Sequence, residues 1–421
     1  MISPNDRSAL ISFLNTKYEY SVRMESNGFA DPYGRFEWLI AASSRAEILI
    51  QEANRSVWDE LQKVTSVKTD CGMHIVTLSY DLKNTLEDLN SDNPDAIEFP
   101  DLCVWSAEVL IALTRAGEFI CKGIANLDEL LQEAQRISNQ GDKDFSLIKV
   151  ESPEFSAYST AFRALQQHIF RGDIYEVNLC RQETACAENL RPEIVFDTLN
   201  HKSPAPFACL HKVQDKYIIC SSPERFLRKD GLSLVSQPIK GTSRRFNEPE
   251  QDRLSAEALR NSAKEQSENV MIVDLVRNDL SHFAAKGSVK VKELFGIYPF
   301  PSVFQMISTV EATLRDSADG IPALAAAFPM GSMTGAPKIS AMQLIEKQET
   351  FKRGIYSGAT GYITDSGDYD FNVVIRSIVW NRSTSVLSLA AGSAITVDAA
   401  ENHEFDECRL KAEALWKAVK Q

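Results

Sequence analysis

The stretch Ser236-Gln237-Pro238-Ile239-Lys240-Gly241-Thr242-Ser243-Arg244-Arg245 presents a lysine directly after an alternating apolar run. The run from Leu232 to Ile239 has the period of a β-strand, so Lys240 is predicted at its end. Gly241 lets the backbone turn or approach a ligand closely. A lysine at a random position is usually a solvated cation, but a held amine with a lowered pKa becomes a nucleophile. The flanking proline and glycine favour the second interpretation for Lys240.

A hairpin is predicted immediately before this stretch. Asp230-Gly231 lies between two apolar runs, which is typical of a tight two-residue turn. If Asp230 and Gly231 are the two turn residues, Glu224 pairs near Gln237. Lys240 lies three residues further on, roughly 10 Å along the strand. Strict alternation puts these two side chains on opposite faces, so they converge only if the chain bends at Pro238 or Gly241. Without such a bend, Glu224 is a salt-bridge partner near a strand end.

Two pairs of glutamates stand at helical spacing. Residues 254–283 predict a helix that breaks or ends near Asn278, and residues 399–420 predict a C-terminal helix. Carboxylates three residues apart share a helical face and repel each other unless a cation joins them. A solvated acidic face explains one such pair, but two pairs suit magnesium, which prefers carboxylate oxygens. The residues are Glu265 and Glu268 on the first helix and Glu404 and Glu407 on the second.

Three further segments are suited to binding an anion. Gly331 to Lys338 precedes a predicted helix, whose free N–H groups suit a carboxylate or phosphate. Phe371 to Ser377 predicts a strand with Arg376 near its end, and a guanidinium binds a carboxylate through two hydrogen bonds. Backbone N–H groups near Gly392, in the predicted strand 387–395, can hold a second carboxylate. The ordinary alternative for Arg376 is a surface arginine at a strand end.

The totals of this 421-residue chain exclude several classes of protein. The net charge of −13 and the absence of a basic block argue against nucleic-acid binding. The eight cysteines form no Cys-x-x-Cys pair, and no leader pattern or membrane-length apolar run is present. We therefore expect a reducing cytoplasm and no membrane partner. The length allows two medium domains, and we place the boundary between residues 1–150 and residues 151–421.

Six motifs spread over residues 153–418 resemble the chorismate-utilising enzymes. Pro238-Ile239-Lys240-Gly241-Thr242 has the form typical of component I of aminodeoxychorismate synthase, also called the para-aminobenzoate synthase large subunit. The related anthranilate synthase large subunit typically has alanine in place of this lysine. The resemblance implies an α+β fold of two packed antiparallel β-sheets flanked by helices. Gln305 departs from the family, which often has histidine there, and an amide cannot relay a proton as imidazole can.

The resemblance also implies a reaction and a site. The 4-hydroxyl of chorismate would be replaced by an amino group, giving 4-amino-4-deoxychorismate for folate synthesis. Lys240 would attack the ring at C2 to form a covalent intermediate, and Glu224 would help the hydroxyl to leave. Magnesium would be held by Glu268 and Glu407, with Glu265 and Glu404 acting through water. The implied substrate contacts are Thr242, Ser332, Tyr356, Arg376 and Gly392.

The source of ammonia and the alternative activities complete these expectations. The sequence has no glutaminase nucleophile motif, so a separate glutamine amidotransferase subunit is expected to supply ammonia. An anthranilate or isochorismate synthase on the same scaffold is an alternative, and Lys240 argues against both. A non-catalytic chorismate-binding subunit is another alternative, although a binding module needs neither Glu224 nor Lys240.

Overall fold

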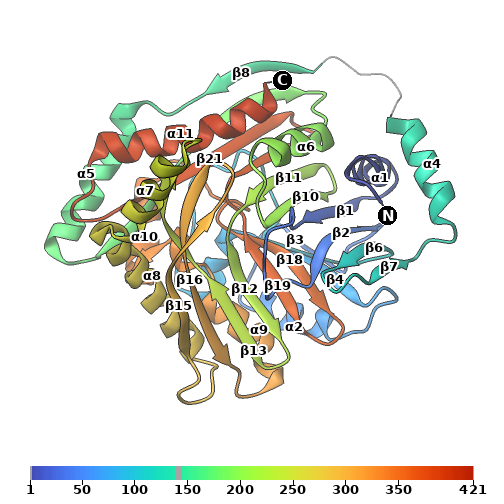
Figure 1. Cartoon of the computed structure of the whole chain (residues 1–421), viewed down its shortest axis with the longest axis horizontal. Coiled ribbons are helices and arrows are strands. Elements are labelled where there is room, and N and C mark those ends of the chain that lie inside the picture. The colour runs from blue at the N-terminus through green and yellow to red at the C-terminus, as the bar shows by residue number, and fades with distance from the viewer. Residues whose placement is uncertain (1, 139–144, 421) are drawn as a thin grey trace.

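Two large antiparallel β-sheets pack together and are enclosed by helices (Figure 1). The computed structural model describes residues 2–138 and 145–420. The predicted linker Gly141 to Asp144 lies outside this part of the chain. The arrangement confirms the expected α+β fold with two packed antiparallel sheets.

Within the described residues, the strands of each sheet follow one another in space in a defined order. The first sheet has 11 strands: β17 (Gly335–Ala336), β9 (Glu176–Glu188), β21 (Val386–Ile395), β20 (Ser377–Asn381), β11 (Lys216–Ser222), β10 (Phe207–Val213), β1 (Tyr20–Glu25), β2 (Phe36–Ser43), β6 (Val109–Thr114) and β7 (Phe119–Lys122), with β8 (Ser146–Glu151) paired to β9. The second sheet has 10 strands: β14 (Ile239–Arg244), β16 (Val303–Thr313), β13 (Ser233–Gln237), β12 (Arg225–Asp230), β19 (Tyr369–Val373), β18 (Ala359–Thr364), β4 (Met73–Leu78), β5 (Leu102–Ser106) and β3 (Ile48–Ile50), with β15 (Lys290–Pro299) paired to β16.

The alternation of side chains along β2 shows how the layers form. Leu39 and Ala41 belong to the apolar cluster between the two sheets. Trp38 and Ile40 belong to another cluster, on the side of the first sheet that faces helices. Because successive residues of a strand point to opposite faces, β2 is apolar on both faces and lies inside the molecule.

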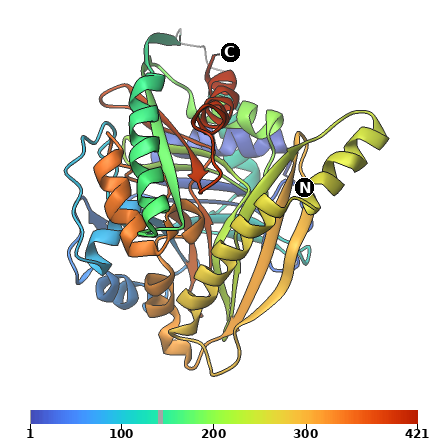
Figure 2. The same ribbon diagram turned by 90° about the vertical axis from the view of Figure 1, so that its left-hand side faces the viewer.

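Helices cover the outer faces of both sheets. Apolar residues of α1, α6 and α11 join the outer cluster of the first sheet, and those of α2, α8 and α9 join that of the second. Figure 2 shows α8 running diagonally along strands of the second sheet, and α8 packs on β14, β15 and β16. No helix in residues 2–138 and 145–420 combines the length and apolar character needed to cross a membrane. The helices are α1 (Pro4–Lys17), α2 (Val57–Thr65), α3 (Lys83–Leu86), α4 (Leu127–Ser138), α5 (Phe155–Arg171), α6 (Pro192–Lys202), α7 (Pro249–Arg260), α8 (Ala263–Ser281), α9 (Gly320–Ala327), α10 (Lys338–Gln348) and α11 (Glu401–Val419).

Strands from the beginning of the chain are built into both sheets. β1 pairs with β10 in the first sheet, and β4 pairs with β18 in the second. Figure 1 shows these early strands in blue beside strands coloured green and orange-red. Both sheets therefore contain strands from residues 1–150 and from residues 151–421. The proposed division into these two domains stays a prediction.

The apolar run Phe371 to Ser377 is two strands rather than the one strand predicted. β19 ends at Val373 in the second sheet, and β20 begins at Ser377 in the first sheet. The chain crosses between the sheets at residues 374–376, where Arg376 has a φ of 51°. Both strands are buried, so the apolar pattern runs through the crossing without a break and does not reveal it.

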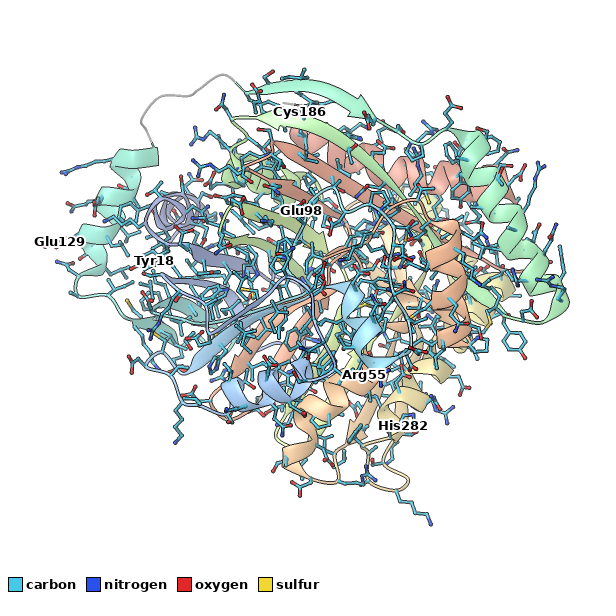
Figure 3. The ribbon with its side chains drawn as sticks, turned by 180° about the vertical axis from the view of Figure 1, so that it is seen from behind. Tyr18, Arg55, Glu98, Glu129, Cys186 and His282 are labelled. Carbon is cyan, nitrogen blue, oxygen red and sulfur yellow. The ribbon has the colours of Figure 1, made fainter. Side chains whose placement is uncertain are left out.

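A buried arginine ties the two sheets together. Side chains fill the space between the layers, whereas labelled residues such as Glu129 and His282 lie at the periphery (Figure 3). The side chain of Arg225, on β12, is 0% exposed. Its guanidinium lies 2.6 Å from Asp31, in the connection between β1 and β2, and 2.8 Å from Asp370, on β19. Removing one partner of such a buried group leaves charges without compensation.

We expect Arg225→Ala to lower the free energy of unfolding by about 3–5 kcal/mol, because Asp31 and Asp370 would remain buried without their partner. Urea denaturation of the purified protein measures this loss. Arg253→Ala is the matched control, since Arg253 pairs with Glu250 and Glu257 at the surface. Equal stability of the two variants would contradict the role of Arg225.

Candidate active site

The predicted site residues line one cavity of about 600 Å³. Its wall is formed by the start of β14, the start of α8, the end of β21 and part of α11. All eleven residues singled out from the sequence line it, although their catalytic and binding roles stay predictions. They are Lys240, Glu224, Thr242, Ser332, Tyr356, Arg376, Gly392, Glu265, Glu268, Glu404 and Glu407.

Lys240 is held by a carboxylate from the opposite sheet. Its Nζ atom lies 2.5 Å from Oε1 of Glu176, the first residue of β9. Burial alone would lower the pKa of Lys240, but the charges of Glu176 and Glu268 outweigh burial and raise it. Lys240 is therefore an ammonium ion at rest, and it must transfer a proton before it can act as a nucleophile.

Glu176 is a site residue that sequence reasoning missed. It stands in the segment Gly172 to Cys180, which resembles the family's helix-to-strand junction and whose sequence mainly predicts a core strand. The side chain is 1% exposed, and its Oε2 atom has no hydrogen-bond partner among the described residues. The signal available in the sequence was a glutamate within a predicted core strand. A carboxylate that is buried in a core needs a cationic or hydrogen-bonding partner.

Glu224 reaches the cavity because the chain bends as the sequence required. The predicted hairpin forms, but its two turn residues are Gly231 and Leu232, since Asp230 pairs with Ser233. Pro238 separates β13 from β14, and β14 pairs with β16 instead of continuing along β12. Glu224 and Lys240 consequently line the same cavity.

The environment of Glu224 favours its protonated form. Ser332 donates a hydrogen bond of 2.6 Å to Glu224 Oε1. Burial raises the pKa of Glu224 to about 7, against the smaller opposing effects of Ser332 and Lys240. A carboxyl group with this pKa can both donate and accept a proton near neutral pH.

An ion pair behind the cavity fixes the segments that carry Ser332 and Glu176. Arg353 donates two hydrogen bonds from one edge of its guanidinium to the carboxylate of Glu349, from Nη2 at 2.6 Å and from Nε at 2.8 Å. The same guanidinium donates to the carbonyl oxygens of Met333 and Asn178, at 2.7 and 3.0 Å. Met333 follows Ser332 in the chain and Asn178 lies two residues after Glu176, so the pair sets the spacing between these segments.

Four glutamates, two from α8 and two from α11, line the cavity. Glu268 Oε1 and Glu404 Oε1 are buried and have no hydrogen-bond partner among the described residues. Glu404 and Glu407 also lie with His403 in a group whose potential ligand atoms are within 4.8 Å of one another. Buried carboxylate oxygens without donors fit a hard divalent cation, for which such oxygens are the preferred ligands.

The remaining predicted residues lie on other parts of the wall. Thr242 donates a hydrogen bond of 3.0 Å to the side-chain oxygen of Gln305. Burial lowers the pKa of Arg376. An arginine side chain nevertheless stays charged in proteins and can only donate hydrogen bonds. A Cβ atom at Gly392 would lie 2.2 Å from Asn178 Oδ1 and 2.6 Å from Cys180 Sγ, so a larger residue there would have to displace these side chains.

This fold and cavity define a chorismate-binding enzyme. The chain belongs to the chorismate binding enzyme family, whose model matches residues 24–417. It is 31% identical over 422 residues to aminodeoxychorismate synthase component 1 of Escherichia coli (strain K12), covering 94% of this chain and 92% of that protein. It is 40% identical over 250 residues to the component 1 of Salmonella typhimurium, a match that spans 59% of this chain and 54% of that protein.

Solved structures support the same fold. Anthranilate synthase component I from Streptococcus pneumoniae TIGR4 superposes with a TM-score of 0.77 at 23% identity, covering 92% of this chain and 93% of that one. The menaquinone-specific isochorismate synthase of Escherichia coli gives a TM-score of 0.77 at 15% identity, covering 99% and 92%. Both similarities confirm the fold that the motifs predicted.

Glu224→Gln should make stability less dependent on pH. The folded pKa of about 7 lies above the usual value of 4.5, so the unfolded chain ionises first as pH rises. The free energy of unfolding therefore falls between about pH 4.5 and 7 because of Glu224, and glutamine removes this loss. The stability of Glu224→Gln relative to the wild type should rise by about 2 kcal/mol between pH 5 and pH 8.

Urea denaturation at the two pH values measures this difference. Glu413→Gln is the control, because Glu413 is exposed on α11 and Lys417 lowers its pKa. A Glu224→Gln variant whose stability runs parallel to the wild type at both pH values would contradict the raised pKa.

Proposed function

We propose that this protein aminates chorismate at C4 and releases 4-amino-4-deoxychorismate, the precursor of para-aminobenzoate in folate synthesis. Membership of the chorismate binding enzyme family and the 31% identity to a component 1 over nearly the whole chain support this assignment. The observation that carries it is the buried Lys240, which shares one cavity with Glu224 and four glutamates. A lysine amine in that position supplies a nucleophile that simple substrate binding does not need.

The proposed first step forms a bond between Lys240 and the chorismate ring. The Lys240 ammonium gives a proton to Glu176, the carboxylate 2.5 Å away. The freed lone pair then bonds to C2, the ring double bonds shift, and the C4–O bond breaks. Glu224 gives its proton to the departing hydroxyl, which leaves as water.

The proposed second step reverses this attachment. Ammonia adds at C4, the ring electrons shift back, and the C2–N bond to Lys240 breaks. Lys240 leaves as an amine and recovers its proton from Glu176, while the Glu224 carboxylate takes a proton from the new ammonium group. Both carboxyl groups and the lysine thus return to their starting states.

The proposed substrate contacts follow from the charge of the cavity wall. Glu265, Glu268, Glu404 and Glu407 would hold magnesium, which would supply positive charge to the ring carboxylate of chorismate. Tyr356, Arg376 and the backbone of Gly392 would bind the enolpyruvyl carboxylate, with Ser332 and Thr242 as further contacts. Cations are required here because the substrate is a dianion and the wall carries many carboxylates.

Ammonia would come from a separate glutamine amidotransferase subunit in the cytoplasm. The name component 1, which several relatives carry, denotes one part of a multi-component enzyme. The chain itself has no glutaminase nucleophile motif. We therefore propose an amidotransferase as its protein partner.

Incubation with chorismate, magnesium and an ammonium salt, followed by product identification, tests this function. We expect 4-amino-4-deoxychorismate with ammonium, and none with glutamine unless an amidotransferase subunit is added. Anthranilate or isochorismate as the product would assign the alternative activities on this scaffold. Chorismate binding without turnover would indicate a non-catalytic subunit.

We expect chorismate to remain attached to Lys240 when ammonia is withheld, because the second step then lacks its amine. Intact-mass measurement and peptide mapping should find one adduct, with the mass of chorismate minus water, on the Lys240 peptide. Lys240→Ala and Lys240→Arg should bind chorismate but form neither adduct nor product, since guanidinium stays protonated.

Lys212 provides an internal control for that labelling. It is a buried lysine outside the cavity, and burial lowers its pKa. Lys212 should remain unmodified by chorismate, because we expect the adduct to require an amine inside the cavity and not only an amine with a lowered pKa. Amination by Lys240→Ala at the wild-type rate would rule out the covalent step.

A further inference from the structure

Lys264 stands at an unfavourable place for a cation. It is the second residue of α8, which begins at Ala263 after the N-cap Ser262. The N-terminus of a helix carries partial positive charge, so a lysine in the first turn weakens the helix slightly. Its presence there calls for a compensating interaction outside α8.

That interaction joins α8 to α11. Lys264 Nζ lies 3.8 Å from Glu268 Oε1 and 3.7 Å from Glu404 Oε1. These are the same two oxygens that are buried without a hydrogen-bond partner in the described chain. Both distances exceed hydrogen-bond length, so the ammonium acts through its charge and is not locked in place.

All four glutamates of the cavity, Glu265, Glu268, Glu404 and Glu407, act on the charge of Lys264. The side chain of Lys264 is nevertheless 41% exposed, whereas those of Glu268 and Glu404 are 8% and 3% exposed. An exposed, flexible stem therefore places one positive charge among buried carboxylates.

We propose that Lys264 competes with the divalent cation for Glu268 and Glu404 and is displaced into solvent when the cation binds. This inference rests on the magnesium site of the proposed function. Magnesium binds carboxylate oxygens at about 2.0–2.1 Å, and its two charges repel an ammonium group placed between the same oxygens. The exposed stem gives Lys264 a path outward without any rearrangement of α8 or α11.

The consequence is an enzyme whose carboxylates are partly neutralised before the metal arrives. Lys411 pairs with Glu407 at 2.6 Å within α11, whereas Lys264 reaches one carboxylate on each of α8 and α11. Without Lys264, Glu268 and Glu404 would lose the cation that contacts both of them, and their mutual repulsion would rise. With Lys264, the spacing between α8 and α11 is maintained, at the expense of metal affinity. A surface ion pair of no consequence would instead involve exposed carboxylates, as Lys417 and Glu413 do on α11.

Isothermal titration of magnesium into the full chain, without chorismate, tests the proposal. Lys264→Met should bind magnesium about two- to tenfold more tightly than the wild type, the factor expected from losing two partly screened ion pairs. Lys264→Arg keeps the charge and should bind like the wild type. Lys417→Met makes the same change in net charge away from the cavity and should also leave the affinity unchanged. Glu268→Gln should abolish the binding heat, which assigns it to this site.

Two measurements do not depend on affinity alone. Lys264→Met should melt at a lower temperature than the wild type without magnesium, and magnesium should raise its melting temperature by more. In the wild type, magnesium should increase the labelling of Lys264 by an amine reagent, detected by peptide mass, and should leave the labelling of Lys417 unchanged.

The outcomes separate this inference from the function on which it rests. A wild-type chain that binds no magnesium would overturn the proposed metal site and the competition together. Magnesium binding with equal or weaker affinity in Lys264→Met would overturn the competition alone. Decreased labelling of Lys264 on addition of magnesium would also count against displacement.

Discussion

The ion pair between Lys240 and Glu176 connects the two sheets at the point where chemistry is proposed. Lys240 belongs to β14, at one end of the second sheet, and Glu176 begins β9, next to one end of the first. A buried ammonium without its partner would carry a large desolvation cost, so the two strands must be held in fixed relative positions. Contacts around the cavity help to hold these two strands in place.

The support comes from two directions. Arg353 and Glu349 hold the segments of Met333 and Asn178 together behind the cavity, and through them Ser332 and the start of β9. Along the cavity wall, α8 and α11 bring their glutamates together, and Lys264 lies between Glu268 and Glu404.

The sequence predicted the site residues better than the way the fold brings them together. Lys240, Glu224 and the two glutamate pairs were found because each stands in a short motif with a recognisable spacing. Glu176 was missed because the direction of a strand side chain depends on which sheet lies opposite, and periodicity carries no information about that. Lys264 was missed for a related reason: a charged residue in the first turn of a helix is normally solvated, and only α11 gives it buried partners.

The error in the run from Phe371 to Ser377 has a physical cause. β19 and β20 are both largely buried, and the crossing at residues 374–376 lies between them. A segment buried on both faces loses the alternation that distinguishes a strand from its surroundings, so the pattern does not mark where one strand ends and the next begins.

The sharing of both sheets between early and late strands has a consequence for synthesis on the ribosome. β4 and its neighbours leave the ribosome long before β18, their partner in the second sheet, has been made. Until then they present an unpaired strand edge and an apolar face, the features that promote aggregation of nascent chains. Such distant pairing also slows folding, because a long loop must close before the contact forms. The early strands are therefore the part of the nascent chain that stays unpaired longest: the second sheet is complete only after Val373 has been added, and the first only after Ile395.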